Sequence, residues 1–227
     1  MKLGMLFSGG KDSTLALHLM IEKKMHIVCL ITVISKNQES YMFHTPNVGV
    51  TVLQAQALGL PLISVNTDGC KEAELADLET AMLQAKTRFD IEGVVTGAVE
   101  SVYQRSRIQR ICDKLGLNCF NPLWQYNQQE LLEELLERNF KVVISGVFAY
   151  PLDESWLGKQ LDHCVIEQLL NLSEKYGVSI TGEGGEIETT VLDAPMFKQK
   201  IEILTSEAIW NRTSGVFVIK KAKLAPK

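Results

Sequence analysis

A six-residue run, Ser8-Gly-Gly-Lys-Asp-Ser13, constrains the fold of this chain more than any other stretch. The apolar residues 3–7 before it are typical of a buried strand, and the apolar run 15–21 after it is typical of a helix. A strand, a glycine turn and a helix start leave backbone N–H groups unpaired at the helix N-terminus, where the helix dipole also favours negative charge. The run therefore predicts an anion-binding loop in an α/β protein.

The residue types of this loop suit a phosphate. Gly9 and Gly10 let the backbone turn sharply and approach a ligand without a Cβ atom between them. Lys11 adds a compact positive charge, and Ser8 and Ser13 add hydroxyl donors. The loop is too tight to be of the Walker type, which has a longer spacing before its Gly-Lys pair.

The pattern of strand and helix continues along the chain. Further strands are expected at 27–34, 62–65 and 91–96, and helices at 14–24, 47–58, 71–89 and around 108–115. Gly59 is expected to end the second of these helices, and Gly116 the last. This alternation predicts a doubly wound parallel sheet over residues 1–121, with its ligand site at the carboxyl ends of the strands. After Asn121-Pro122, helices at 127–138 and 158–175 and strands at 140–147, 187–192, 200–204 and 216–224 predict a smaller α+β domain over 122–227. We expect the first domain to bind ATP and the second to bind the substrate.

Composition narrows the class of protein. The chain has 227 residues, 46% of them hydrophobic, which suffices for a full core. It has no apolar run of membrane-spanning length and no signal-type segment at its start, so we expect a cytoplasmic protein without a membrane partner. The net charge of −4 predicts no general attraction to nucleic acid. The sequence contains no Cys-x-x-Cys pair, so it gives no indication of a zinc site. The oligomeric state is left open, a homodimer included.

A second feature is the acidic, glycine-containing run Glu183-Gly-Gly-Glu-Ile-Glu-Thr189. Glu186 and Glu188 are two residues apart on an expected strand, so they are predicted to share a face. Carboxylates this close repel one another unless a metal, a cationic ligand or an arginine lies nearby. A solvated hairpin tip is the alternative, but the glycines and the apolar continuation after Thr189 favour a functional segment.

The two runs resemble those of known families. The loop resembles the pyrophosphate loop (PP-loop) of the ATP pyrophosphatase superfamily, whose fold is of the adenine nucleotide alpha hydrolase-like type. That resemblance implies cleavage of ATP between its α and β phosphates. Together with residues 183–198, the loop resembles the diphthine–ammonia ligase family, and residues 40–45, 103–107, 115–117 and 152–158 are similar to it as well. The likeness runs from about residue 4 to about residue 204.

The second resemblance implies an enzyme, an AMP-forming carboxylate–ammonia ligase. Its protein substrate would be elongation factor 2 carrying diphthine, whose carboxylate is adenylated by ATP and then attacked by ammonia, giving diphthamide, AMP and pyrophosphate. Adenylation is chemically necessary because a carboxylate has no good leaving group. No glutaminase domain is visible, so free ammonium is the expected nitrogen donor.

The resemblance and the residue types together predict the site. The residues expected to bind ATP are Ser8, Gly9, Gly10, Lys11, Asp12, Ser13, Gly97 and Arg105. The residues expected to bind the substrate are Tyr41, His44, Trp156, Glu183, Gly184, Gly185, Glu186, Glu188 and Thr189. Lys11, Asp12 and Glu186 are the expected catalytic residues. We expect the glutamates and Trp156 to face the trimethylammonium group of diphthine, because such groups favour carboxylates and aromatic faces.

Several of these roles have alternatives. Asp12 would hold Mg²⁺ against the departing pyrophosphate, or would instead cap the helix. Arg105 would contact phosphate or substrate, or would be solvated like Arg107 and Arg110. His44 would act as a base, or would only bond locally.

Three rival functions also remain. They are a tRNA-thiolating enzyme of the same superfamily, an enzyme that adenylates another carboxylate, and an ATP-binding sensor without turnover. The absence of paired cysteines and the acidic pI of about 5.7 count against the tRNA enzyme.

Overall fold

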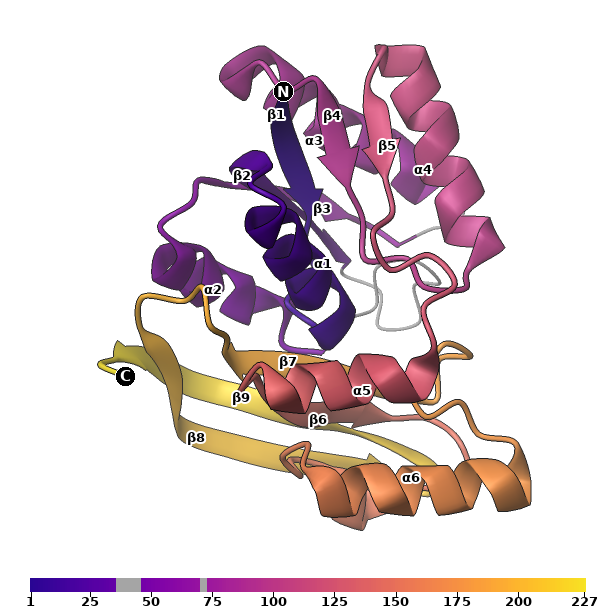
Figure 1. The fold of residues 1–227 in the computed structure, drawn as a ribbon. Coiled ribbons are helices and arrows are strands. Elements are labelled where there is room, and N and C mark those ends of the chain that lie inside the picture. The colour runs from indigo at the N-terminus through magenta and orange to yellow at the C-terminus, as the bar shows by residue number, and fades with distance from the viewer. Residues whose placement is uncertain (36–45, 70–72) are drawn as a thin grey trace.

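The computed structural model describes residues 1–35, 46–69 and 73–227, and contains two sheets flanked by helices (Figure 1). Tyr41 and His44 lie outside the described residues. The first sheet is five-stranded and parallel, in the order β3-β2-β1-β4-β5, and the second is four-stranded and antiparallel, in the order β7-β6-β9-β8. The expected fold class, a doubly wound parallel sheet followed by a smaller α+β part, is confirmed.

The parallel sheet follows the expected alternation. Its strands are β1 (Lys2–Leu6), β2 (His26–Ser35), β3 (Leu62–Thr67), β4 (Gly93–Val95) and β5 (Asn118–Phe120). Its helices are α1 (Lys11–Glu22), α2 (Thr51–Leu58) after the 3-10 turn η1 (Val48–Val50), α3 (Ala73–Phe89) and α4 (Val102–Leu115). The strand order reverses between β1 and β4, and ligands bind at such a switch point in open α/β sheets.

Glycines end two of these helices as the sequence indicates. Gly59 follows α2 with φ +70°, and Gly116 follows α4 with φ +61°. Both are in the left-handed region, where a residue without a Cβ atom is least strained. These ends send the chain back toward the sheet for β3 and β5.

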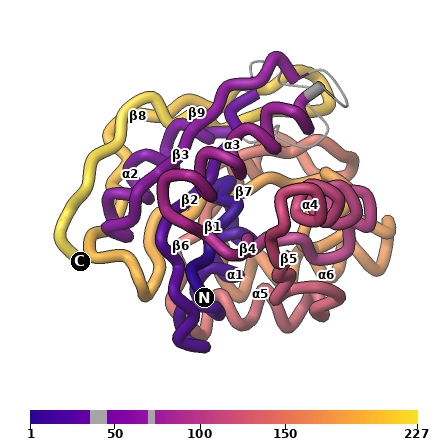
Figure 2. The backbone as a smooth tube through the Cα atoms, turned by 90° about the horizontal axis from the view of Figure 1, so that it is seen from above, coloured from indigo at the N-terminus to yellow at the C-terminus, as the bar shows by residue number. Residues whose placement is uncertain are grey.

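The C-terminal part of the chain forms the second sheet and the helices packed on it. The strands of this sheet are β6 (Lys141–Val147), β7 (Ile187–Asp193), β8 (Lys200–Asn211) and β9 (Ser214–Ala225). The helices are α5 (Gln128–Glu137), the 3-10 turn η2 (Glu154–Trp156) and α6 (His163–Tyr176). Helix α6 begins later than predicted because Asp162 caps it, its Oδ1 accepting the N–H of Val165 at 2.8 Å. Strand β8 is longer than predicted because it pairs with β9 along a hairpin that closes between Asn211 and Ser214. This hairpin is drawn in yellow and orange at the edge of the backbone tube in Figure 2.

The core joins the two sheets. The face of the parallel sheet under α3 and α4 has an apolar cluster of its own. The opposite face, under α1 and α2, shares one continuous apolar cluster with α5, α6, β6 and β7. Helix α1, which starts at the predicted phosphate loop, is therefore packed between the two sheets (Figure 1).

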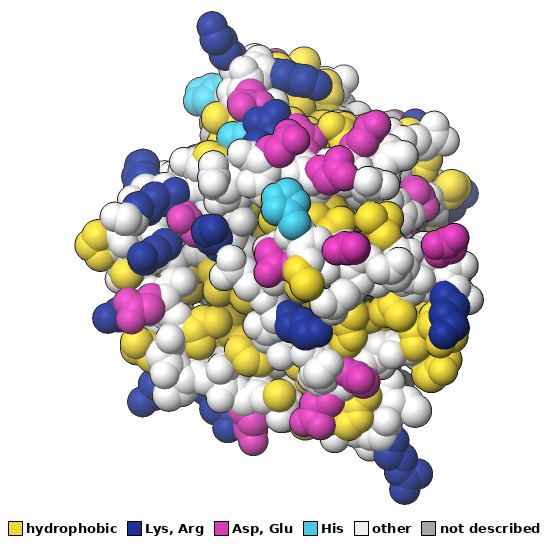
Figure 3. All heavy atoms as spheres, turned by 60° about the horizontal axis from the view of Figure 1, so that its bottom comes forward, with side chains coloured by type: hydrophobic (Ala, Val, Ile, Leu, Met, Phe, Trp, Pro, Cys, Tyr) yellow, Lys and Arg dark blue, Asp and Glu magenta, His cyan; other side chains and the backbone are white. Residues whose placement is uncertain are grey.

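The surface is of mixed charge. On the face shown in Figure 3, acidic and basic side chains are interspersed with apolar ones. Among the helices of the described residues, none combines the length and the apolar character needed to cross a membrane.

Candidate functional site

A cavity of about 980 Å³ opens beyond the carboxyl ends of β1 and β4. Its wall is formed by the loop before α1, the connection between β4 and α4, residues 181–185 and 187–189, and the tip of the β8–β9 hairpin. Residues from both sheets thus line one space, and the two runs singled out in the sequence face it from different sides.

The phosphate loop presents the N-terminus of α1 to this cavity. Helix α1 has Gly10 at its N-cap, without a capping side chain, and Gly9 has φ +81°. Ser8 Oγ lies 3.1 Å from Ser13 Oγ and accepts the N–H of Gly10 at 3.3 Å. The positive end of the helix dipole and two hydroxyl groups are therefore directed at one place, which suits a phosphate.

Gly97 packs against the start of α1. A Cβ atom at this position would lie 2.7 Å from the backbone N of Ser13 and 2.9 Å from the carbonyl carbon of Asp12. Gly97 also lines the cavity. The contact between the β4–α4 connection and α1 by itself requires a residue without a Cβ atom here, and the expected contact of Gly97 with ATP stays a prediction.

Lys11 is buried within a group of carboxylates. Its Nζ donates to Asp12 Oδ2 at 2.9 Å and to the carbonyl oxygen of Thr181 at 2.5 Å. Burial lowers the pKa of Lys11, but the charges of Asp12, Glu183 and Glu188 act against this, and the pKa is raised overall. Lys11 is thus a permanent cation at the cavity wall.

The three glutamates of the acidic run point in different directions. Glu183 and Glu188 line the cavity, whereas Glu186 does not. Glu186 Oε1 accepts the N–H of Ser179 at 3.2 Å, and Oε2 accepts the N–H of Gly184 at 2.9 Å. The predicted shared face of Glu186 and Glu188 is wrong, because β7 begins only at Ile187 and Glu186 belongs to the turn before it.

The two glutamates in the cavity have unusual acidity. Burial, together with the charge of Asp12, raises the pKa of Glu183 to about 7, although Lys11 opposes the shift. Burial likewise raises the pKa of Glu188 to about 7 against the opposing effect of Lys11. Carboxyl groups with a pKa near neutrality can both give and accept protons, which is the property of acid–base groups in active sites.

Strand β7 is bonded directly to the phosphate loop. The N–H of Lys11 donates to Thr189 Oγ1 at 3.1 Å, and the N–H of Val191 donates to the carbonyl oxygen of Gly9 at 3.0 Å. Gln54 Nε2 donates to Gly9 O at 2.9 Å and to Val191 O at 2.8 Å. We call this set of bonds the loop–β7 contact.

The sequence analysis missed Gln54. Its signal was weak, since it is a polar residue four positions from Val50 and from Leu58, in the apolar stripe of the expected helix 47–58. Both of these neighbours are buried, and so is Gln54.

Two residues predicted for the site lie elsewhere. Trp156 is buried in the shared core, with Lys159 Nζ 4.4 Å from the centroid of its ring, and it does not line the cavity. Arg105 is exposed on α4, with its guanidinium carbon 4.3 Å from the ring centroid of Trp124, and it does not line the cavity either. Phe148 is an aromatic residue that does line it.

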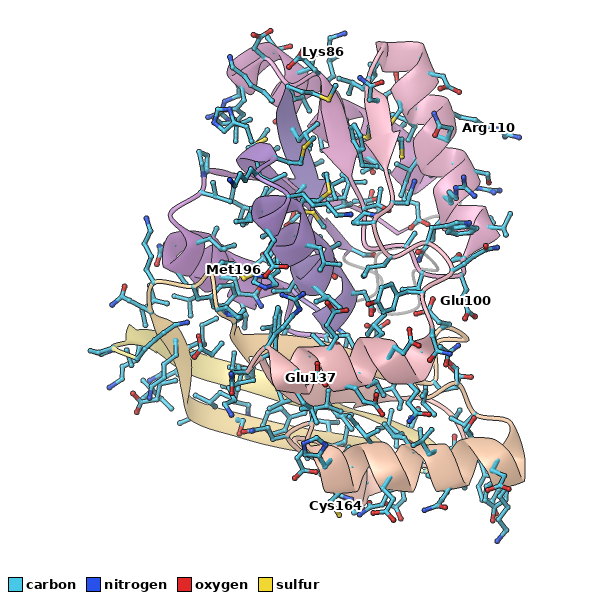
Figure 4. All side chains as sticks on the ribbon, viewed as in Figure 1. Lys86, Glu100, Arg110, Glu137, Cys164 and Met196 are labelled. Atoms are coloured by element: carbon cyan, nitrogen blue, oxygen red, sulfur yellow. The ribbon has the colours of Figure 1, made fainter. Side chains whose placement is uncertain are left out.

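The other predicted positions are placed as follows. Gly184, Gly185 and Thr189 line the cavity. Arg110 projects outward from α4 in Figure 4, as expected for a solvated face.

The fit of a magnesium ion depends on Asp12. Its Oδ1 is buried and has no hydrogen-bond partner among the described residues. Within the same residues, no group of three or more His, Cys, Asp or Glu side chains is arranged to hold a metal. Mg²⁺ commonly takes one or two carboxylates together with phosphate oxygens, so one carboxylate at the phosphate loop fits such a site.

Comparison with known proteins gives consistent matches. The family described as diphthamide synthase N-terminal domain matches residues 1–119, and the diphthamide synthase C-terminal domain matches residues 127–225. The diphthine–ammonia ligase of Rattus norvegicus is 39% identical over 256 residues, which cover 100% of this chain and 96% of the relative. The diphthine–ammonia ligase of Homo sapiens is 37% identical, with 92% of this chain and 85% of the relative covered.

A solved structure shows a more distant likeness. It is described as a predicted subunit of tRNA methyltransferase from Methanocaldococcus jannaschii, and it is 17% identical with a TM-score of 0.44. The match covers 86% of this chain and 98% of the other. At this distance the likeness carries no argument.

Proposed function

This chain belongs to the diphthamide synthase family, and from that premise we propose that it amidates the diphthine carboxylate of elongation factor 2 with ATP and ammonia. Diphthine–ammonia ligases that are 31–39% identical to it support a ligase of diphthamide synthesis. The finer proposal is the route through an acyl-adenylate, with AMP and pyrophosphate as the other products.

The single observation that carries the proposal is the contact of the phosphate loop with the acidic run at residues 183–189, called the acidic segment from here on. Lys11 contacts Asp12 and Thr181 in one cavity lined by Glu183 and Glu188. A cation with helix N–H groups suits a phosphate, and carboxylates suit a cationic substrate. Their closeness is what a reaction between ATP and a charged side chain requires.

In the first step, a diphthine carboxylate oxygen attacks the α-phosphorus of ATP, and the bond to pyrophosphate breaks. We assign the phosphates to the N–H groups at the start of α1, to Ser8 and Ser13, and to Lys11, whose charge would offset that of the leaving pyrophosphate. Asp12 would hold Mg²⁺ there, and the ion would supply further neutralisation of phosphate charge. The adenine would occupy the apolar side of the cavity, lined by Leu78 and Ile108.

In the second step, the ammonia nitrogen attacks the acyl carbon, and AMP leaves with the electrons of the broken C–O bond. Ammonium must lose one proton before it attacks, and the nitrogen loses a second proton when the amide forms. We assign acceptance of the first proton to Glu188, because a carboxylate with a pKa of about 7 is matched to neutral pH. The second proton would pass to solvent. Glu183 and Phe148 would face the trimethylammonium group. Glu186 would act by holding the turn, and not by touching substrate.

The proposal also assigns ATP binding and substrate binding to different parts of the chain. Residues 1–121 would bind ATP, and residues 122–227 would supply most of the groups that select the substrate. The hairpin tip at 209–216, which also lines the cavity, would belong to the substrate side.

The test is release of AMP and pyrophosphate by the purified chain, with and without diphthine-bearing elongation factor 2, supplied with ammonium chloride or with glutamine. We expect AMP in step with amide formation, only with the modified factor, and with ammonium as donor. ATP binding without AMP release under any condition would contradict the proposal and favour an ATP-binding sensor without turnover. AMP release with a different carboxylate or with tRNA would assign the adenylation to another acceptor.

A further inference from the structure

Gln54 is fully buried on α2, and its side-chain amide is hydrogen-bonded to the backbone of the phosphate loop. Its Nε2 group has two hydrogens, and both are used, one on the carbonyl oxygen of Gly9 and one on that of Val191. Three segments distant in the chain, the loop, α2 and β7, therefore meet at a single amide.

The direction of this amide is determined by its partners. The alternative orientation would place Gln54 Oε1 against two carbonyl oxygens, which only accept hydrogen bonds. In the observed orientation Oε1 is buried without a hydrogen-bond partner among the described residues. It lies over the Cα of Gly9, since a Cβ built there would be 2.3 Å from it. A buried acceptor left unsatisfied requires an explanation other than stability.

The geometry points to Gln54 as a positioning residue for the ligation reaction, an inference that rests on the proposed function. Gln54 holds the carbonyl of Gly9 in the turn that opens the phosphate loop and, with the same group, holds β7 at Val191. Strand β7 carries Glu188 and Thr189, so this amide, together with the direct hydrogen bonds of the loop–β7 contact, holds these two residues in position relative to the phosphate loop. An error in such a position lowers the rate of the chemical step far more than it weakens binding.

The test compares Gln54→Met with Gln56→Met in the full chain. Gln56 lies on the same helix and is exposed, so it controls for the change of residue type. We expect Gln54→Met to lower kcat for amide formation by at least about tenfold, with the KM for ATP within about threefold of wild type. The Gln56→Met variant should match wild type in both. A kcat of Gln54→Met equal to that of Gln56→Met, or a loss confined to KM, would overturn the inference.

A second variant and a second measurement separate positioning from simple loss of stability. Gln54→Glu keeps the shape, but its ionised carboxylate can donate to neither carbonyl, so it should lose kcat as Gln54→Met does. Hydrogen exchange in both variants should become at least about tenfold faster in peptides spanning 5–17 and 186–193, and stay unchanged in 73–89. Uniformly faster exchange would mean that Gln54 serves stability alone and would overturn the inference.

Failure of the proposed function would look different. In that case the wild-type chain itself would form no amide, whereas failure of the inference leaves wild type active and Gln54→Met as active as its control. The hydrogen-exchange measurement is independent of the substrate. Unchanged exchange rates in the peptides 5–17 and 186–193 of the Gln54 variants would also overturn the positioning role of Gln54.

Discussion

The phosphate loop and the acidic segment line one cavity, but they present different kinds of chemical group to it. In the loop, the proposed phosphate site consists of backbone N–H groups at the start of α1, and a strand–glycine–helix pattern dictates where these point. In the acidic segment, the proposed functional groups are side chains, and a turn decides their direction. Glu183 and Glu188 face the cavity while Glu186 bonds to its own turn.

This difference teaches that a motif of backbone groups transfers directly from sequence to structure, whereas a motif of side chains does not. Strand periodicity placed Glu186 beside Glu188, but the strand begins one residue after Glu186. A single residue of offset in the strand start is enough to reverse the direction of a side chain.

The largest expected effect comes from replacing Lys11 in the phosphate loop. We expect Lys11→Met to lower kcat/KM for ATP by about 10²–10³-fold, because the positive charge that we assign to the developing phosphate charge is lost. Steady-state release of AMP measures this, with Lys23→Met as the control, since Lys23 is exposed at the other end of α1. Retention of ATP cleavage within about threefold would show that backbone groups suffice without the cation.

The comparison within the acidic segment is sharpened by a matched pair of variants. We expect Glu188→Gln to lower kcat of amide formation by about 10²-fold, because the group assigned to the proton is lost. Glu186→Gln should leave kcat near wild type and lower the free energy of unfolding by about 1–2 kcal/mol, because one accepting oxygen is replaced by a donor that faces an N–H group. Activity assays and urea unfolding of both variants check this. The opposite ranking in kcat would restore the catalytic role that the sequence suggested for Glu186.

The contact between Gly97 and α1 gives a smaller expected effect. In Gly97→Ala, the added Cβ would meet backbone atoms of Ser13 and Asp12, which cannot move aside as a side chain can. We expect a loss of about 1–3 kcal/mol in unfolding free energy and weaker ATP binding.

Gly49→Ala is the matched control for this glycine. A Cβ at Gly49 meets nothing within 4 Å, so the change should stay within about 0.5 kcal/mol of wild type. Equal stability of the two alanine variants in chemical denaturation would mean that the β4–α4 connection shifts freely away from the loop.

The last prediction concerns a gradual dependence of stability on pH. Glu183 and Glu188 have pKa values of about 7 when folded, against an ordinary value of 4.5. Between these values the folded chain binds more protons than the unfolded chain, so these groups make the free energy of unfolding fall as pH rises from about 4.5 to 7. The slope from each is at most about 1.4 kcal/mol per pH unit.

A double variant isolates this contribution from that of the other carboxylates. Urea denaturation of wild type and of Glu183→Gln with Glu188→Gln, at pH values across this window, gives the difference in slope. We expect the double variant to lose the downward contribution with rising pH. Parallel curves would show that the two carboxyls ionise as they do in solvent.

The sequence by itself determined the elements and the phosphate loop. Alternating strands and helices predicted the parallel sheet, and Gly59 and Gly116 marked two helix ends at left-handed residues. These features depend on residues within a few positions of one another, so a local pattern carries them.

Only the tertiary structure decided which side chains share the cavity. It placed Trp156 in the core and Arg105 against Trp124, and it brought Gln54 to the loop–β7 contact. Lys11 and Thr189 are 178 positions apart and are joined by one hydrogen bond. Contacts of this kind come from the packing of two sheets around a common core, and no local period encodes which buried group a distant segment will meet.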